Sequence, residues 1–141
     1  MRACFFPVLF FFAFPLWPQD SEPHFFVGMK LAELINRFGP PETVYAARGD
    51  ESWQDDVVFE YAQGDFYIYR DRVWQVKLTS AYGIAVGDTK PAALLALGGQ
   101  AEDMGNYMLL PLSGGAWPLT LRVNFSSEGL ASAIFVYRQD F

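Results

Sequence analysis

A short pattern occurs twice in this 141-residue chain, with a constant spacing of 59 residues. Val27-Gly28 precedes an apolar stretch that stops at Phe38-Gly39. Val86-Gly87 precedes another that stops at Leu97-Gly98. Recurrence of matched positions at one fixed offset is typical of an internal repeat, because each copy encodes the same structural unit. The spacing therefore predicts two similar units in one chain.

Each unit is expected to open with a helix. Apolar residues recur every three or four positions over 29–38, as in an amphipathic helix, and Gly39 with two following prolines ends the stretch. In the second unit, Asp88 is expected to cap a helix whose first turn holds Pro91 and which ends before Gly98.

Three segments rich in β-branched and aromatic residues follow each predicted helix. These segments are 57–61, 66–70, 73–79, 107–112, 119–125 and 130–137. We therefore expect an α+β fold in which two αβββ repeats form a two-layer sandwich, with an antiparallel sheet of about six strands and both helices on one face. A single domain over 20–141 would hold the repeats at about 26–80 and 85–137.

Alternation along the predicted strands assigns side chains to the two faces of the sheet. One set is apolar and is expected to form the core beneath the helices: Val57, Phe59, Tyr61, Phe66, Ile68, Trp74, Val76, Leu78, Leu119, Leu121, Val123 and Phe125. The opposite set is polar but unusually rich in aromatic side chains. That combination makes the second face the candidate functional surface.

Tyrosine and tryptophan are favoured at protein interfaces because they bury a large area at little entropic cost and keep a polar group. The predicted partner-binding residues are Tyr67, Tyr69, Arg122, Phe135 and Tyr137 on the sheet, with Trp53 and Trp117 in loops. The alternative is that these aromatic side chains cover a second core surface, under the 40–56 loop or at a homodimer contact. The sequence leaves both interpretations open.

Residues 1–19 differ from the rest of the chain. Arg2 precedes a mostly apolar run that ends near Trp17, the plan of a secretory signal peptide. Cleavage would fall between residues 14 and 21, and the alternatives are an uncleaved anchor or a buried strand. We expect a periplasmic or secreted protein with no stable membrane span after processing. Removal of the segment would also remove Cys4, the one cysteine.

Composition and side-chain chemistry argue against several classes of function. Lys plus Arg number 10 against 16 Asp plus Glu, a net charge of -6 that disfavours nucleic acid as a partner. His24 is the one histidine and is expected to be solvated ahead of the fold. Asp50, Glu51, Asp55 and Asp56 are interpreted as a solvated loop, because they lack the spacing of a calcium loop. No catalytic set, metal site or cofactor is predicted, so the chain is not expected to be an enzyme.

The order Val27-Gly28-Met29, apolar helix, Phe38-Gly39-Pro40-Pro41 and three strands resembles small bacterial envelope repeats. These are the β-lactamase-inhibitor-protein-like (BLIP-like) and SmpA/OmlA (BamE-like) families. The resemblance implies an exported, non-enzymatic module that binds another protein through the aromatic face of its sheet, as an inhibitor, an adaptor or an envelope-assembly accessory. The alternative function is a periplasmic carrier of a small apolar ligand.

Overall fold

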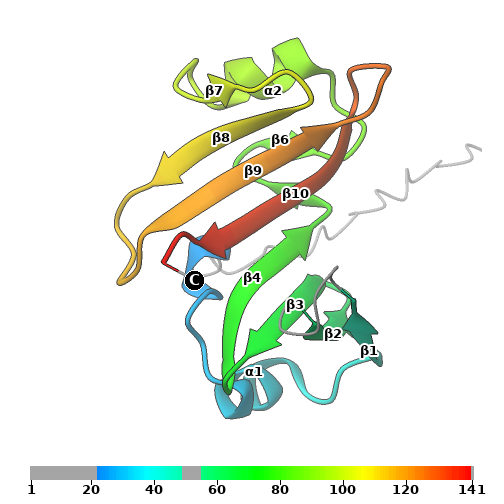
Figure 1. Cartoon of the computed structure of the whole chain (residues 1–141), viewed down its shortest axis with the longest axis vertical. Coiled ribbons are helices and arrows are strands. Elements are labelled where there is room, and N and C mark those ends of the chain that lie inside the picture. Colours follow the sequence, from blue (N-terminus) through cyan, green and yellow to red (C-terminus); the bar gives the residue numbers. More distant parts are fainter. Residues whose placement is uncertain (1–21, 49–54, 141) are drawn as a thin grey trace, which may run out of the picture.

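One antiparallel sheet of eight strands dominates the computed structural model, which describes residues 22–48 and 55–140 (Figure 1). The strand order is β1-β2-β3-β4-β10-β9-β8-β7. The strands are β1 Thr43–Ala47, β2 Asp56–Tyr61, β3 Gly64–Tyr69, β4 Arg72–Leu78, β7 Glu102–Asp103, β8 Tyr107–Leu112, β9 Leu119–Phe125 and β10 Ala131–Arg138. The predicted signal peptide and Trp53 lie outside the described residues.

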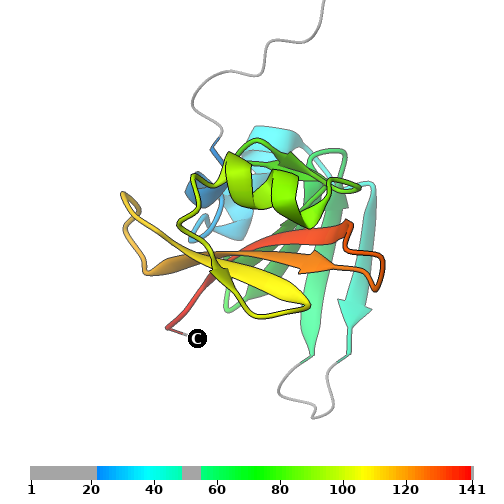
Figure 2. The ribbon, with the colours of Figure 1, turned by 90° about the horizontal axis from the view of Figure 1, so that it is seen from above.

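The helical elements are short and lie on one side of this sheet, as the view from above shows (Figure 2). They are the 3-10 helix η1 Pro23–Phe25, α1 Leu31–Phe38 and α2 Lys90–Ala96. A small hairpin, β5 Ser80–Ala81 with β6 Ile84–Ala85, connects β4 to α2. The sheet therefore has one face covered by helices and one open face.

The predicted two-repeat α+β sandwich with about six strands is wrong. Segment 43–47, which was expected to belong to a loop, and segment 102–103, which was not predicted to be a strand, pair with β2 and β8 and extend both edges of the sheet. The first of these segments reads Thr-Val-Tyr-Ala-Ala and contains residues that favour strands. With helices of only eight and seven residues, the fold is sheet-rich.

The segment before α1 is attached to the sheet by backbone hydrogen bonds. The Gly28 N–H donates to the Val73 carbonyl at 2.7 Å, and the Val73 N–H donates to the Met29 carbonyl at 2.9 Å. The Leu31 N–H then donates to the Asp71 carbonyl at 3.0 Å. These bonds fix the start of α1 against the end of the β3–β4 turn. Gly28 has a φ of 95°, which few other residues adopt.

The segment before α2 makes the same three contacts in the second half of the chain. The Gly87 N–H donates to Ala131 and the Ala131 N–H donates to Asp88, both at 2.8 Å. The Lys90 N–H donates to the Gly129 carbonyl at 3.0 Å. Gly87 has a φ of 97°. Residues at the 59-residue spacing thus occupy matching positions, although the whole molecule is one continuous sheet.

The start of α2 differs from its predicted cap. Thr89 is the capping residue, and its Oγ1 accepts from the Ala92 N–H at 3.4 Å. The Asp88 carboxylate instead accepts from the Ala85 N–H at 2.7 Å. Asp88 therefore stabilises the turn that leads into the helix, because its side chain points back along the chain.

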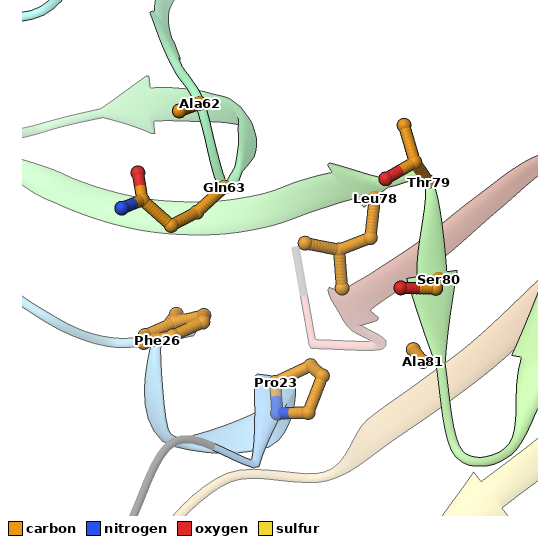
Figure 3. Close-up of a pocket in the computed structure, with 8 residues that line it drawn as sticks. All are labelled: Pro23, Phe26, Ala62, Gln63, Leu78, Thr79, Ser80 and Ala81. Atoms are coloured by element: carbon orange, nitrogen blue, oxygen red, sulfur yellow. The ribbon is translucent and has the colours of Figure 1, made fainter. Parts of the chain in front are cut away.

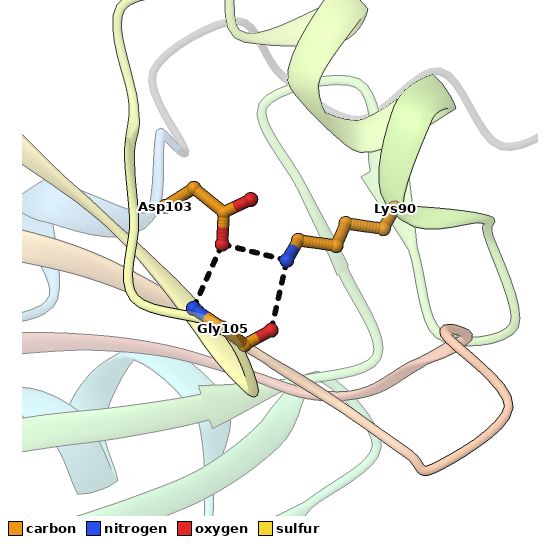
Figure 4. Close-up of polar contacts among 3 residues, drawn as sticks. All are labelled: Lys90, Asp103 and Gly105. Carbon is orange, nitrogen blue, oxygen red and sulfur yellow. Dashed lines mark hydrogen bonds and ion pairs between the residues drawn. The ribbon is translucent and has the colours of Figure 1, made fainter.

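A polar cluster ties α2 to the short edge strand β7 (Figure 4). Lys90 Nζ lies 2.6 Å from Asp103 Oδ1 and donates to the Gly105 carbonyl at 2.8 Å. The same carboxylate oxygen accepts from the Gly105 N–H at 2.8 Å. The hydrogen bond from Lys90 holds the pKa of Asp103 below its usual range. This cluster connects the helix to the turn before β8.

A single apolar core runs beneath both helices because β4 pairs with β10 in the middle of the sheet. Val76 lies opposite Val136, and Leu78 lies opposite Ile134. Three of these four side chains, Val76, Val136 and Ile134, are fully buried, as is Leu34 from α1. The core cluster also includes Phe26, Phe66, Ile84, Ala93, Leu121 and Val123.

Gly28 and Gly87 offer a matched test of how the α1 segment packs. A Cβ at Gly28 would overlap the indole of Trp117, whereas a Cβ at Gly87 meets nothing within 4 Å. Gly87→Ala should lower the free energy of unfolding by about 1–2 kcal/mol, because it adds only backbone strain. Gly28→Ala should cost about 1–3 kcal/mol more, because the overlap adds to the same strain. Urea unfolding of both variants measures this difference.

A Trp117→Ala background provides the control. Removal of the indole should make the cost of Gly28→Ala equal to that of Gly87→Ala, since only the backbone term remains. Equal costs in the parent protein would contradict the packing of Trp117 on Gly28.

Candidate functional site

A β-bulge in β4 shapes the open face. Pairing of β3 with β4 shifts by one residue beyond Tyr67, so Gln75 and Val73 are successive partners and Trp74 is the extra residue. Val73 and Val76 are both fully buried. Trp74 and Gln75 therefore both reach the open face, and the prediction that Trp74 belongs to the core is wrong.

Seven side chains surround a shallow hollow of about 450 Å³ on this face, which we call the open-face hollow. Four contribute aromatic rings and three contribute planar polar groups. They come from β3, β4, β10 and β9, which are consecutive in the sheet. The residues are Tyr67, Trp74, Gln75, Arg122, Asn124, Phe135 and Tyr137.

Four of the predicted partner-binding residues lie together in this hollow: Tyr67, Arg122, Phe135 and Tyr137. Alternation placed Tyr67 and Arg122 on the same face but did not decide the face of Phe135 and Tyr137, because the last strand is apolar on both sides. Pairing of β4 with β10 and of β10 with β9 brings the four side by side. Sequence reasoning left three lining residues out of the candidate set. Gln75 and Asn124 alternate onto the polar face but were not among the predicted partner-binding residues, and Trp74 was assigned to the core.

The structure separates Tyr69 and Trp117 from the other candidates. Tyr69 lies at the end of β3, where the Arg70 guanidinium stands 5.1 Å from the centre of its ring. Trp117 packs against the core cluster and Gly28, with the Arg138 guanidinium 3.8 Å from its ring. Trp117 thus stabilises the loop between β8 and β9.

Arg122 is held in a fixed orientation at the hollow. Its guanidinium carbon lies 4.1 Å from the centre of the Tyr107 ring. Its Nε donates a 2.7 Å hydrogen bond to Asn124 Oδ1. The guanidinium is thus restrained by the ring that it packs on and by the hydrogen bond at Nε. Such an arginine loses little further conformational entropy when its remaining N–H groups bind a partner.

The β2 side of the open face carries its own packed layer. Val58 is fully buried but does not belong to the core cluster, and it pairs with Tyr45 on one side and Tyr67 on the other. Val57, predicted to lie in the core, is 48% exposed. Part of this aromatic surface therefore covers an apolar side chain outside the main core.

Trp74 and Tyr67 form the wall of the hollow next to this layer. Their rings meet edge to face with centroids 6.4 Å apart. Trp74 Nε1 donates to Asp56 Oδ1 at 3.0 Å. Burial raises the pKa of Asp56, although the hydrogen bond from Trp74 opposes that shift. The wall is thus braced by a hydrogen bond as well as by ring packing.

Tyr67 is an unusually weak acid. Burial raises its pKa to about 12 from an ordinary value of 10.0, and negative charge on Tyr45, Asp65 and Asp56 adds to the shift. The neutral phenol is therefore the form that the folded chain prefers. Near neutral pH, Tyr67 can therefore donate a hydrogen bond.

This shift has a consequence for stability at high pH. A group whose pKa rises on folding stabilises the folded state below its unfolded value, and that stabilisation is lost as pH rises toward the folded value. The free energy of unfolding should fall between pH 10 and pH 12. The free energy of unfolding of the Tyr67→Phe variant, measured by urea titration, should fall less steeply over this pH window. Equal slopes would contradict the burial of the phenol.

A second pocket lies on the helix side, between η1, the β2–β3 turn and β5 (Figure 3). Its volume is about 310 Å³, and its lining residues are Pro23, Phe26, Ala62, Gln63, Leu78, Thr79, Ser80 and Ala81. The apolar members Phe26 and Leu78 belong to the core cluster. This pocket is thus separate from the open-face hollow.

His24 is more buried than predicted. Its side chain is only 11% exposed, and its Nδ1 lies 3.3 Å from the Tyr82 hydroxyl and 3.3 Å from the Glu22 carboxylate. Burial raises the pKa of Tyr82 to about 12. The expectation of a solvated histidine is wrong because η1 packs against the chain near Tyr82.

Within 22–48 and 55–140, no group of three or more His, Cys, Asp or Glu side chains could hold a metal ion. Asp55 lies near the Arg48 guanidinium, and Asp50 and Glu51 fall outside these ranges. Neither α1 nor α2 has the length and apolar run that crossing a bilayer requires.

The fold is similar to parts of two solved structures. An extracellular protein containing an SCP domain from Bacillus anthracis superposes with a TM-score of 0.60 at 9% identity, over 88% of this chain and 48% of that protein. A cysteine-rich secretory protein from Staphylococcus aureus superposes with a TM-score of 0.52 at 13% identity, over 86% and 47%. The chain spans about half the length of each. No protein-family model and no curated protein sequence matches it.

The expected membership in the BLIP-like or BamE-like families is therefore wrong. The structural matches are proteins described by an SCP domain or as cysteine-rich secretory proteins. The residues that carried the resemblance form a glycine turn and a helix stop, and many folds use both before a strand. At 9% and 13% identity the likeness concerns the fold alone.

Proposed function

We propose that this chain is an exported, non-catalytic module that captures another protein through the open face of its sheet. The observation that carries the proposal is the open-face hollow, with four aromatic rings and three planar polar groups on adjacent strands. Side chains held on strands are better ordered for binding than side chains on loops. Such a surface would suit an inhibitor, an adaptor or an envelope-assembly accessory.

The chemistry of the hollow favours binding over catalysis. Its one charged side chain is Arg122, and a guanidinium stays protonated in proteins. Tyr67 is neutral near neutral pH, because burial raises its pKa to about 12. General acid–base catalysis instead needs a group that titrates near the working pH. Aromatic rings beside an arginine are typical of the residues that dominate binding energy at protein interfaces.

Export is supported by two independent features. The apolar segment over 1–19 has the plan of a signal peptide. Two solved structures with a similar fold come from proteins described as extracellular and secretory. We therefore extend secretion to this chain, either into a periplasm or out of the cell.

The alternative function is a carrier of a small apolar ligand, for which the helix-side pocket would serve. Its volume of about 310 Å³ lies at the lower limit of small-molecule sites, which run from about 300 to 1,000 Å³. Gln63, Thr79 and Ser80 make part of its lining polar. The open-face hollow has the larger aromatic content, so we favour the protein-binding function.

Tyr67→Ala and Tyr137→Ala test the proposal. Each removes one aromatic wall of the hollow, so each should reduce capture of the partner from envelope extract at least tenfold. Leu95→Ala is the matched control, because Leu95 is 82% exposed on α2, on the helix side of the sheet. Quantitative pull-down measures capture, and circular dichroism checks the fold. Capture that is unchanged by both tyrosine substitutions would sink the proposal.

A further inference from the structure

Arg122 is a half-buried charge with no ion pair among the described residues. Each salt bridge within 22–48 and 55–140 involves another cation, and the neighbouring Lys77 is 3.5 Å from Asp65. Charged groups that are partly removed from water are normally compensated by a group of opposite sign. The open-face hollow thus offers positive charge within a chain of net charge -6.

The geometry of Arg122 leaves its outer N–H groups for a ligand. Asn124 accepts from Nε, and the Tyr107 ring supports the guanidinium plane. The two terminal nitrogens form no hydrogen bond or ion pair with a described residue, and together they match the two oxygens of a carboxylate. The site is therefore arranged for bidentate recognition of an acidic group.

Apolar side chains lie on both sides of Arg122 across the sheet. Phe135 is its partner on β10, and Leu109 is its partner on β8. The partner residues on either side of a carboxylate bound to Arg122 would therefore contact these two apolar side chains. The hollow is also open and spans four strands, a shape that suits a segment of protein rather than an enclosed small molecule.

We propose that Arg122 binds an aspartate or glutamate side chain of the partner, within a segment whose neighbouring residues are apolar and pack on Phe135 and Leu109. This inference rests on the proposed function and specifies the partner chemistry for the same site. The overall acidity of the chain repels other acidic proteins at long range. Arg122 then supplies selectivity for a segment that also fits the aromatic walls.

Selection from a phage-displayed library of random short peptides tests this assignment without knowledge of the natural partner. The purified protein, the Arg122→Gln variant and the Arg37→Gln variant serve as bait. Arg37 is the control, because it stacks over Phe26 and Phe38 on the helix side at about 5.5 Å. The parent and the control should enrich peptides with Asp or Glu beside apolar residues. Arg122→Gln should lose that acidic preference.

A selected peptide then gives a quantitative test by fluorescence anisotropy. Replacement of its acidic residue by the amide should weaken binding to the parent at least tenfold and leave binding to Arg122→Gln unchanged. Equal binding of both peptides to the parent, or failure of the library to yield any binder, overturns the proposal. Displacement of the peptide by free glutamate at similar concentration also overturns it, because the site would then take a small acid.

The outcomes also separate this inference from the proposed function. If Arg122→Gln captures the natural partner as well as the parent does while Tyr67→Ala does not, the open face binds a protein but Arg122 does not select it. If neither tyrosine variant affects capture, the proposed function itself fails.

Discussion

The one-residue shift between β3 and β4 is the constraint on which the open face depends. It keeps Val73 and Val76 in the core and turns both Trp74 and Gln75 outward. Regular alternation would place only one of those two side chains on the open face. The bulge therefore supplies an aromatic ring and an amide to a surface that pairing with β10 and β9 completes. Bulges of this kind often lie next to functional sites because they redirect side chains.

The covered face provides the rigidity that such a site needs. Two glycine segments attach the helices to the ends of β4 and β10 through matched backbone hydrogen bonds. The ion pair of Lys90 with Asp103 connects α2 to the edge strand β7, and Trp117 packs against Gly28 in the segment before α1. Because β4 contributes Val73 and Val76 to the core and β10 contributes Ile134 and Val136, the residues of the open-face hollow stand on strands that the core holds in place.

Much of the candidate site could be predicted from the sequence because alternation is a local signal. Tyr67, Arg122, Phe135 and Tyr137 alternate with buried residues in regular strands, and the structure brings them together. Trp74 was misassigned because a bulge interrupts the period. The one clue to the bulge was the spacing of the valines on either side of Trp74. Val73 and Val76 are three residues apart, whereas regular alternation on one face needs a spacing of two.

The remaining errors arise from tertiary contacts and from short elements. Strands β1 and β7 were missed because five and two residues carry little pattern, and pairing with a neighbour decides their conformation. Trp117 was expected on the open face, but its contact with Gly28 joins residues far apart in sequence. The glycine and proline motifs indicated the turns correctly, yet they did not determine the fold family, because such turns are common to many folds.

Site-specific photocrosslinking in the native cell tests the central claim, that the open face is the surface that meets the partner. A benzoylphenylalanine at position 137 lies in the open-face hollow, and one at position 95 lies on α2. The account predicts a discrete covalent adduct from Tyr137→benzoylphenylalanine and none from Leu95→benzoylphenylalanine. An adduct from position 95 alone, or from neither position, would contradict it.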